Sequence, residues 1–374
     1  MLDNVKTAES YTEEENKKET EILNEEIPDV DISKLVGNQQ RIFLKVLSHY
    51  QQILAGTDPP PLRINIDGTA GTGKSFLISA ITKAVTNIAL ERGHPSPIIR
   101  MAPTANAAFN IHGTTIHQSL SLPKSELPPL NNQQKGQLQR RWEGCKYIIL
   151  DEKSMVGRRL LSKMDARLRD AFPEKQNEMF GGCSILLLGD FGQLPPVGDL
   201  PLFNLHASDR GKPEAIMASN KGRALFMSLM ESITLDRIMR QQGENPSAVQ
   251  FRQVLSNLQS MEATEADCQF LNTRYIGNLS APEVAGFEDA VYLCPTNQKV
   301  DEINESKMSA SGKPVLIVPA RNKGPGASSA SDDEAEGLAG KLLLMEGAKV
   351  MLTRNIWTTK GLTNGSMGTI GTAF

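Results

Sequence analysis

The sequence predicts an α/β fold with mostly parallel sheets, and two kinds of pattern support this prediction. Short apolar runs of the kind found in buried parallel strands recur along the chain, and helical or irregular segments separate them. A strand pattern over residues 62–67 leads through a glycine-rich turn into a helical pattern over 74–90. This strand, turn and helix succession is the local framework of a P-loop nucleotide-binding fold.

The remaining elements are predicted in chain order. Residues 35–54 have helical periodicity, which ends before the three prolines at 59–61. Further buried parallel strands are expected at the apolar runs 98–102, 147–150, 185–188, 291–294 and 349–352. Two long segments, 123–137 and 319–340, are rich in loop-forming residues and are expected to be surface insertions.

Charge is distributed unevenly along the chain. Residues 1–33 hold eleven acidic residues and three lysines, a net charge of −8. Because the whole chain carries −3, residues 34–374 carry +5. The acidic segment has few aromatic residues and no sustained apolar period, so 1–33 is predicted to be a disordered tail. The mildly basic remainder is compatible with a groove that follows nucleic-acid phosphates.

Cysteine and hydropathy patterns exclude several classes. The four cysteines are far apart, none has C-x-x-C spacing, and the five histidines do not cluster with them. A disulfide framework and a zinc site are therefore not expected, and a reducing compartment fits best. No apolar run approaches the length of a membrane span, so no membrane partner is expected.

The strongest motif is Gly68-Thr-Ala-Gly-Thr-Gly73-Lys74-Ser75, which fits G-x-x-x-x-G-K-[ST]. Its glycines allow backbone N–H groups to turn inward around phosphates, and Lys74 is predicted to reach the β- and γ-phosphates of ATP. Ser75 is predicted to ligate Mg²⁺. A glycine-rich turn with a surface lysine is the alternative, which the preceding strand and following helix disfavour. The nucleotide-binding residues are thus Gly68, Thr69, Ala70, Gly71, Thr72, Gly73, Lys74 and Ser75.

Two further motifs follow apolar runs. Asp151 and Glu152 come directly after the apolar run 147–150. At this position of a P-loop enzyme, Asp151 is predicted to hold Mg²⁺ and Glu152 to orient and deprotonate the attacking water. Gly189-Asp190 follows 185–188 and leads to Gln193, an amide suited to bridge the γ-phosphate and water. A strand-end acidic cap and an ordinary loop glutamine remain the alternatives.

The order of these motifs resembles the Pif-type (petite integration frequency) DNA helicases of superfamily 1B, including the helicase portion of Helitron-type transposons. The shared segments are 68–75, Ala-Pro-Thr at 102–104, Gly-Thr-Thr-Ile-His at 113–117, Asp-Glu-Lys-Ser-Met at 151–155 and 189–196. The resemblance covers about residues 35–370. It implies two RecA-like domains: a complete first domain over 34–232, with an accessory insertion at about 113–142, and a partial second domain over 233–374.

The resemblance also implies residue roles. Gln39, or its neighbour Gln40, would read adenine, and Arg240 would reach the γ-phosphate across the cleft. An ordinary helix-surface arginine is the alternative for Arg240. The residues that would touch a DNA strand are Pro103, Thr104, Asn106, Phe109 and His117.

Two departures from the family pattern stand out. Ala105-Asn106 replaces the glycine that usually follows the Ala-Pro-Thr motif. The chain also ends at Phe374, before the family's His-Lys-Ser-Gln-Gly run and final arginine, so a C-terminally truncated helicase is expected.

The resemblance implies an ATP- and Mg²⁺-dependent 5′-to-3′ DNA helicase. It would act on single-stranded DNA and DNA junctions in repair, recombination and telomere maintenance, in the nucleus and also in mitochondria. One alternative is a helicase relic that binds ATP and DNA without unwinding. Another is an unrelated P-loop ATPase or kinase, which His117 and the 189–196 motif disfavour. The sequence indicates no oligomeric state.

Overall fold

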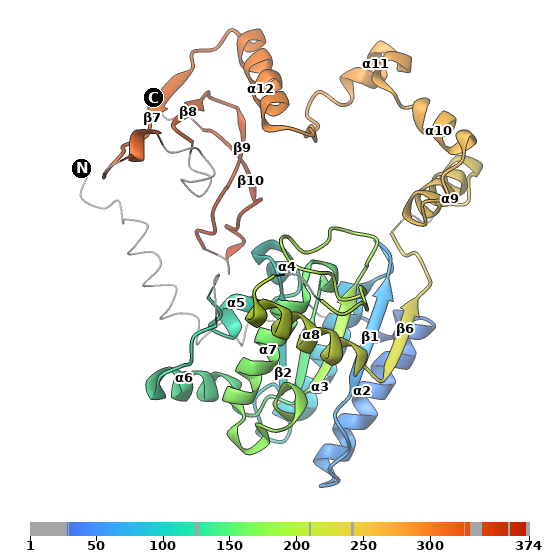
Figure 1. The fold of residues 1–374 in the computed structure, drawn as a ribbon. Coiled ribbons are helices and arrows are strands. Elements are labelled where there is room, and N and C mark those ends of the chain that lie inside the picture. The colour runs from blue at the N-terminus through green and yellow to red at the C-terminus, as the bar shows by residue number, and fades with distance from the viewer. Residues whose placement is uncertain are drawn as a thin grey trace. The chain divides into compact units, whose positions relative to one another are not determined.

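The computed structural model describes residues 28, 30–123, 127–208, 211–240, 243–324, 326–329, 339–357 and 360–371. The chain divides into two compact units, Met1–Arg252 and Gln253–Phe374 (Figure 1). Most of the expected disordered tail, 1–33, lies outside the described residues, which include only 28 and 30–33 of it. The described part of this tail leads into a short 3-10 turn, η2 (Ile32–Lys34), which the Asp31 side chain caps.

The first unit is built on one six-stranded sheet in which every strand pair is parallel, with the order β3-β2-β4-β5-β1-β6. Its strands are β1 (Arg63–Gly68), β2 (Ile98–Ala102), β3 (Thr114–Thr115), β4 (Tyr147–Leu150), β5 (Ser184–Gly189) and β6 (Glu231–Leu235). The predicted α/β class with a parallel sheet is confirmed, and the four apolar runs between residues 62 and 188 form β1, β2, β4 and β5.

Alternation along the buried strands produces a core on each face of this sheet. In β5, Leu186 and Leu188 join one core, whereas Ile185 and Leu187 join the other, because successive side chains of a strand point to opposite faces. Helices α2 (Asn38–Leu54) and α3 (Lys74–Leu90) complete the first core. The second core is completed by α5 (Ile116–Ser119), α6 (Asn132–Trp142), α7 (Arg158–Ala171) and α8 (Pro213–Met227), as seen in Figure 1.

The segment 123–137 was expected to be a long surface loop. Residues 132–137 are exposed or half-buried as expected, but they are helical, so the loop prediction was wrong from Asn132 onward. Oδ1 of Asn131 accepts a hydrogen bond from the Gln134 backbone N–H, and Oε1 of Gln134 accepts one from the Asn131 backbone N–H. This capping box starts α6, and Leu138 and Trp142, four residues apart, bury one face of it. The Asn- and Gln-rich composition concealed a capped amphipathic helix.

The second unit contains mainly short elements. Its helices are α10 (Glu265–Asn272), α11 (Ala281–Ala285) and α12 (Asn297–Ser311), while α9 (Pro246–Gln259) spans the boundary between the units. Strands β7 (Leu316–Pro319) and β8 (Lys341–Leu344) form one antiparallel pair, and β9 (Lys349–Met351) and β10 (Met367–Thr369) form another.

Two strand predictions were wrong in this unit. Residues 291–294 have no regular structure, and Leu293 is 96% exposed. Residues 349–351 do form a strand, but it is antiparallel and exposed rather than parallel and buried. An apolar run becomes a buried strand only where neighbouring strands and helices cover it, and composition alone does not reveal these neighbours.

The remaining described elements are short. Helix α4 (Ala105–Asn110) follows β2, and the 3-10 turns after η2 are η3 (Lys153–Met155), η4 (Pro173–Lys175), η5 (Met179–Gly182), η6 (Ile276–Asn278) and η7 (Ala327–Ser329). Within the described ranges, no helix combines the length and apolar character needed to cross a membrane.

Candidate active site

The predicted nucleotide motifs lie together at one edge of the parallel sheet. The P-loop follows β1, Asp151 and Glu152 follow β4, and Asp190 follows β5. These three strands are neighbours in the order β4-β5-β1. Because all of them are parallel, their carboxyl ends meet at the same edge, where open α/β sheets bind ligands.

The P-loop has the backbone geometry of a phosphate cradle. Gly71 and Gly73 have φ angles of +84° and +79°, in the region that favours glycine. A Cβ atom at Gly71 would lie 2.7 Å from Cβ of Arg240, and one at Gly73 would lie 2.5 Å from Nε2 of Gln39. The backbone conformation therefore favours glycine at both positions, and the Arg240 Cβ also leaves no space for a side chain at Gly71. Thr69 and exposed Ala70 form the tip of the loop between Gly68 and Gly71.

Lys74 is directed into this loop. Its ammonium donates hydrogen bonds to the carbonyl oxygens of Gly68 and Thr69, at 2.7 and 3.2 Å. Thr72 closes the same turn, since its N–H and its hydroxyl both donate to the Thr69 carbonyl oxygen. The cation is thus held among backbone groups at the start of α3, the end of a helix that attracts anions.

Gln39 and Arg240 both lie against the P-loop. Gln39 is 3% exposed; its Nε2 donates to the Thr72 carbonyl oxygen at 2.8 Å, and its Oε1 accepts from the Val36 N–H at 3.2 Å. The neighbouring Gln40 is exposed. The backbone N–H of Met239 donates to the Gly71 carbonyl oxygen at 2.7 Å, which places the exposed Arg240 beside the loop. Their roles toward adenine and γ-phosphate stay predictions.

The acidic pair after β4 combines burial with unusual backbone geometry. Asp151 is 5% exposed, and burial raises the pKa of its carboxyl to about 6. The hydrogen bond from the Glu152 backbone N–H lowers this pKa, the Glu152 carboxylate raises it, and Lys74 lowers it. Glu152 has φ +52° and ψ +46°, a left-handed conformation that non-glycine residues adopt at a cost of roughly 1–2 kcal/mol. Such strain is often found at functional sites.

Gln193 lies in the exposed loop after β5. Its Nε2 donates to Oδ2 of Asp190 at 3.1 Å, and its backbone N–H donates to the Asp190 carbonyl oxygen at 3.0 Å. Asp190 is 8% exposed. The structure therefore holds the amide of Gln193 through a carboxylate at the end of β5.

Lys153 is a residue of the site that the motif analysis did not assign. It is fully buried behind Asp151 and Glu152, and its Nζ lies 2.5 Å from Oδ1 of Asp67 on β1. The sequence contained no clear signal for this pair, because Asp67 occupies a polar position of the alternating strand pattern over 62–67. It is the full burial of Lys153 that requires a partner of opposite charge. Nothing in the spacing pointed to a partner 86 residues away.

The residues expected to touch DNA lie at the ends of β2 and β3, at the same edge of the sheet. Thr104 caps α4 by accepting a hydrogen bond from the Ala107 N–H, and Asn106 and Phe109 are exposed on that helix. Pro103 is half-buried just before the cap, and His117 is half-buried on α5, after β3. The structure thus places all five on, or just before, two short helices that follow adjacent strands.

The departure at Ala105 fits this geometry. Ala105 is the first residue of α4, is 7% exposed and requires no glycine conformation. A methyl group is therefore accommodated at this position, away from the exposed face formed by Asn106 and Phe109.

The metal expected at this site is Mg²⁺. Mg²⁺ usually retains several waters and binds through one or two protein oxygens together with substrate phosphates. The Ser75 hydroxyl on the first turn of α3 and the Asp151 carboxylate supply this kind of set. Among the residues that the structure describes, no group of three or more His, Cys, Asp or Glu side chains is arranged to hold a metal ion on its own.

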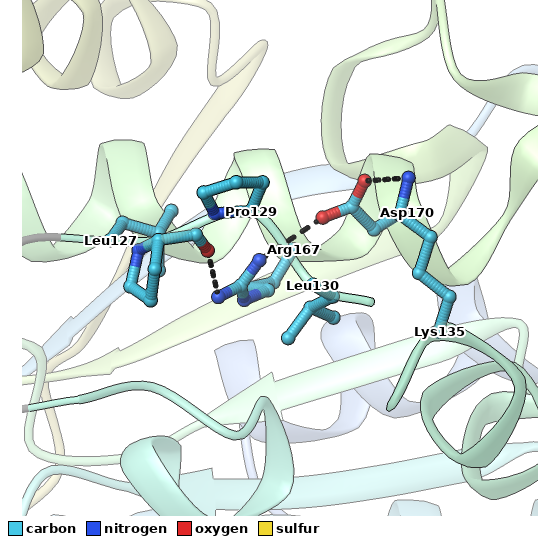
Figure 2. A pocket seen from close by; sticks show the side chains of 7 residues that line it. Leu127, Pro129, Leu130, Lys135, Arg167 and Asp170 are labelled. Atoms are coloured by element: carbon cyan, nitrogen blue, oxygen red, sulfur yellow. Dashed lines mark hydrogen bonds and ion pairs between the residues drawn. The ribbon is translucent and has the colours of Figure 1, made fainter. Parts of the chain in front are cut away.

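A separate pocket of about 280 Å³ lies against α7, and Figure 2 shows the side chains that line it. Buried Arg167 donates to the Pro128 carbonyl oxygen at 2.7 Å and pairs with Asp170 at 3.2 Å. The lining residues are Leu127, Pro128, Pro129, Leu130, Lys135, Arg167 and Asp170. None of the motif residues belongs to this pocket.

The parallel sheet, the glycine cradle with Lys74, and the acidic pair on a nearby strand define a P-loop nucleoside triphosphatase with a RecA-like fold. Comparison with known proteins identifies the family. The family model described as PIF1-like helicase matches residues 34–266, more than half of the chain. The chain therefore belongs to the PIF1-like helicase family, as its motif order indicated.

Relatives and solved structures agree with this assignment. The chain is 29% identical over 308 residues to the ATP-dependent DNA helicase PIF1 of Danio rerio and 30% identical over 314 residues to that of Saccharomyces cerevisiae. Each alignment covers 81% of this chain, but only 43% and 33% of the respective relatives, so the chain spans less than half of their length.

Two solved structures share the fold. Pif1 helicase from Candida albicans has a TM-score of 0.58 at 24% identity, covering 90% of this chain and 68% of that one. Pif1 from Bacteroides in complex with ADP-AlF3 and ssDNA has a TM-score of 0.56 at 22% identity, covering 87% and 70%.

Proposed function

We propose that this chain is the ATP-hydrolysing part of a DNA helicase that couples ATP hydrolysis to 5′-to-3′ movement on single-stranded DNA. The observation that supports this proposal is the arrangement of two sets of residues along one sheet edge. The nucleotide motifs follow β1, β4 and β5, and the candidate DNA-contacting residues follow β2 and β3. A displacement of one strand-end loop is therefore transmitted to the neighbouring loop over a short distance.

Each residue of the site has a chemical task in this proposal. The N–H groups of the P-loop and the Lys74 ammonium bind the phosphates. Ser75 and Asp151 hold Mg²⁺, which would neutralise charge on the phosphate oxygens. Glu152 accepts a proton from the attacking water, and Gln193 orients that water from its position beside Asp190. Arg240, beside Gly71, stabilises negative charge that develops during transfer.

The proposed partners follow from the family. Relatives carry the name ATP-dependent DNA helicase; one solved neighbour is in complex with ssDNA, and another is described as unwinding DNA at forked dsDNA. For this chain we propose single-stranded DNA and DNA junctions as substrates, roles in repair, recombination and telomere maintenance, and a nuclear and also mitochondrial location. Strand binding would combine phosphate contacts with stacking of bases on an aromatic side chain such as Phe109.

The test is ATP hydrolysis by the purified 374-residue chain with and without single-stranded DNA. Strong stimulation by DNA that disappears in Lys74→Ala is the expected result. Lys83→Ala is a matched control, because Lys83 lies on the same helix α3 but beyond its first turn. ATP and DNA binding without turnover would contradict the motor and favour a binding relic. ATP turnover by a chain that neither binds DNA nor is stimulated by it would favour an unrelated P-loop ATPase.

A further inference from the structure

Lys153 joins two strands that carry different nucleotide motifs. It follows Asp151 and Glu152 in η3, and its side chain is 0% exposed. Its Nζ lies 2.5 Å from Oδ1 of Asp67, 2.5 Å from Oδ1 of Asn65 and 2.9 Å from the Ile66 carbonyl oxygen. An ammonium has three N–H donors, and here three oxygens accept them. All three belong to β1, the strand that leads into the P-loop.

The side chain of Lys153 crosses the end of β5, which lies between β4, the strand before Lys153, and β1, the strand of its partners. The strand order is β4-β5-β1, so a residue after β4 must cross the end of β5 to reach β1. Gly189, the β5 residue paired with Asp67, provides the space. A Cβ atom at Gly189 would lie 2.8 Å from the Lys153 backbone N and 2.9 Å from its Cγ. The glycine of the 189–196 motif therefore has a role in the packing of this lysine.

The loop after β5 also contacts the ammonium. Nζ of Lys153 lies 4.7 Å from the centroid of the Phe191 ring, within the range of a cation–π interaction. The Phe191 ring packs edge-on against Phe203 and Phe226, at centroid distances of 5.3 and 5.9 Å. Phe191 lies between Asp190 and Gln193 in the chain. One side chain thus contacts the segments that carry all three motifs.

The partner carboxylate is held from its other side. Oδ2 of Asp67 accepts from Nδ2 of Asn65 at 2.8 Å and from the Ser232 hydroxyl at 3.4 Å. Asn65 also donates to the Ser232 hydroxyl at 2.7 Å. The Asp67 side chain is 32% exposed, whereas the Lys153 side chain is fully buried. Fully hydrogen-bonded polar networks of this kind fix one arrangement of the groups around them.

We infer that Lys153 is a positioning residue that sets the relative placement of the P-loop, the Asp151–Glu152 pair and the Gln193 loop. Its three N–H donors are all used by oxygens of β1, so it acts through the backbone on either side of it and through Phe191. This inference rests on the proposed ATP hydrolysis for its kinetic consequence. Its geometric consequence is independent of that proposal.

The kinetic test uses Lys153→Met and the double variant Lys153→Met with Asp67→Asn. We expect Lys153→Met to lower kcat for ATP at least about 10-fold while changing the affinity for a fluorescent ADP analogue less than about 3-fold, because small misplacements of catalytic groups act on turnover. The double variant removes the unpaired carboxylate and restores the melting temperature, but it leaves kcat low. A purely structural role predicts instead that kcat returns with the melting temperature, which would overturn the inference.

Arg167→Met is the matched control. Arg167 is also buried and paired with an aspartate, but its partners lie on α7 and in the loop before α6 (Figure 2). We expect a lower melting temperature with unchanged kcat per folded molecule. If Lys153→Met fails to fold, Phe191→Leu removes the ring and keeps the ion pair, and it is expected to lower kcat several-fold. Unchanged kcat in the folded variant would contradict the inference.

Amide hydrogen exchange separates this inference from the proposed function. In the nucleotide-free protein, Lys153→Met is expected to speed exchange in 151–155 and 189–193, whereas Arg167→Met is not. If the unmodified chain lacks ATPase activity, the proposed function fails, and this exchange pattern still tests the placement. Unchanged exchange in both segments would overturn the inference whatever the ATPase result.

Discussion

Nε2 of Gln39 donates a hydrogen bond of 2.8 Å to the carbonyl oxygen of Thr72, and this bond ties the start of α2 to the P-loop. The other end of the amide accepts from the Val36 N–H, so both ends of Gln39 are engaged within the protein. A glutamine expected to read adenine thus also supports the loop that holds the phosphates. Binding of adenine by this amide would require exchange of one of these bonds.

Replacement of this glutamine is predicted to weaken the loop. Gln39→Ala leaves the Thr72 carbonyl oxygen without its donor, a loss of about 1–3 kcal/mol in the free energy of unfolding for a buried acceptor. We also expect weaker nucleotide binding. Urea unfolding and titration with a fluorescent ATP analogue measure the two effects. Gln40→Ala changes an exposed neighbour and is expected to alter neither; equal effects from both variants would contradict the support by Gln39.

A second prediction concerns pH. The pKa of Asp151 is raised from 3.8 to about 6 in the folded protein, so the fold favours the protonated carboxyl. This contribution to stability is fully present below the unfolded pKa and is lost as pH rises through about 6. A shift of about two pKa units corresponds to roughly 3 kcal/mol.

Asp151→Asn should therefore stabilise the nucleotide-free protein at pH 7–8 and have little effect near pH 4, while it abolishes ATP hydrolysis. Urea unfolding of both proteins across this pH range measures the difference. A variant that is less stable than the unmodified chain at pH 8 would show that the buried carboxylate is already compensated by charges around it.

A third prediction compares two glycines. Gly71→Ala places a Cβ atom 2.7 Å from Cβ of Arg240 on a backbone with φ +84°, so we expect a loss of stability of about 1–2 kcal/mol or more and loss of nucleotide binding. Gly136→Ala on α6 meets open space without a left-handed φ and should stabilise by about 0.5–1 kcal/mol. Thermal melting and ATP binding of the two variants test this contrast. A Gly71→Ala protein that binds ATP normally would contradict the cradle assignment.

The extent to which sequence predicts this fold depends on how local each determinant is. The P-loop and α3 were predicted because their signals lie within one continuous segment. Lys153 was not assigned a role, because its meaning depends on Asp67, to which three-dimensional packing alone brings it close. The run 291–294 satisfied a strand pattern, but a strand also needs a partner, and partners are not encoded locally.

The last prediction concerns the candidate DNA surface on α4. Phe109 is 37% exposed on a helix that follows β2, at the edge that carries the nucleotide motifs. Stacking of one base on an aromatic ring contributes about 1–3 kcal/mol to the binding of single-stranded nucleic acid. Phe109→Ala should therefore weaken single-stranded DNA binding by about 5- to 150-fold, with little change in melting temperature because the ring is partly exposed. Fluorescence anisotropy with a labelled oligonucleotide measures the affinity.

A matched control lies at the other edge of the sheet. Leu90 is 60% exposed at the last residue of α3, a helix that starts at the P-loop and runs away from it. Leu90→Ala removes exposed apolar surface of similar kind, and we expect it to leave DNA affinity unchanged. Equal losses in both variants would indicate a general effect of surface hydrophobicity. An unchanged affinity in Phe109→Ala would remove stacking at α4 from the proposed strand path and leave phosphate contacts as the main source of binding.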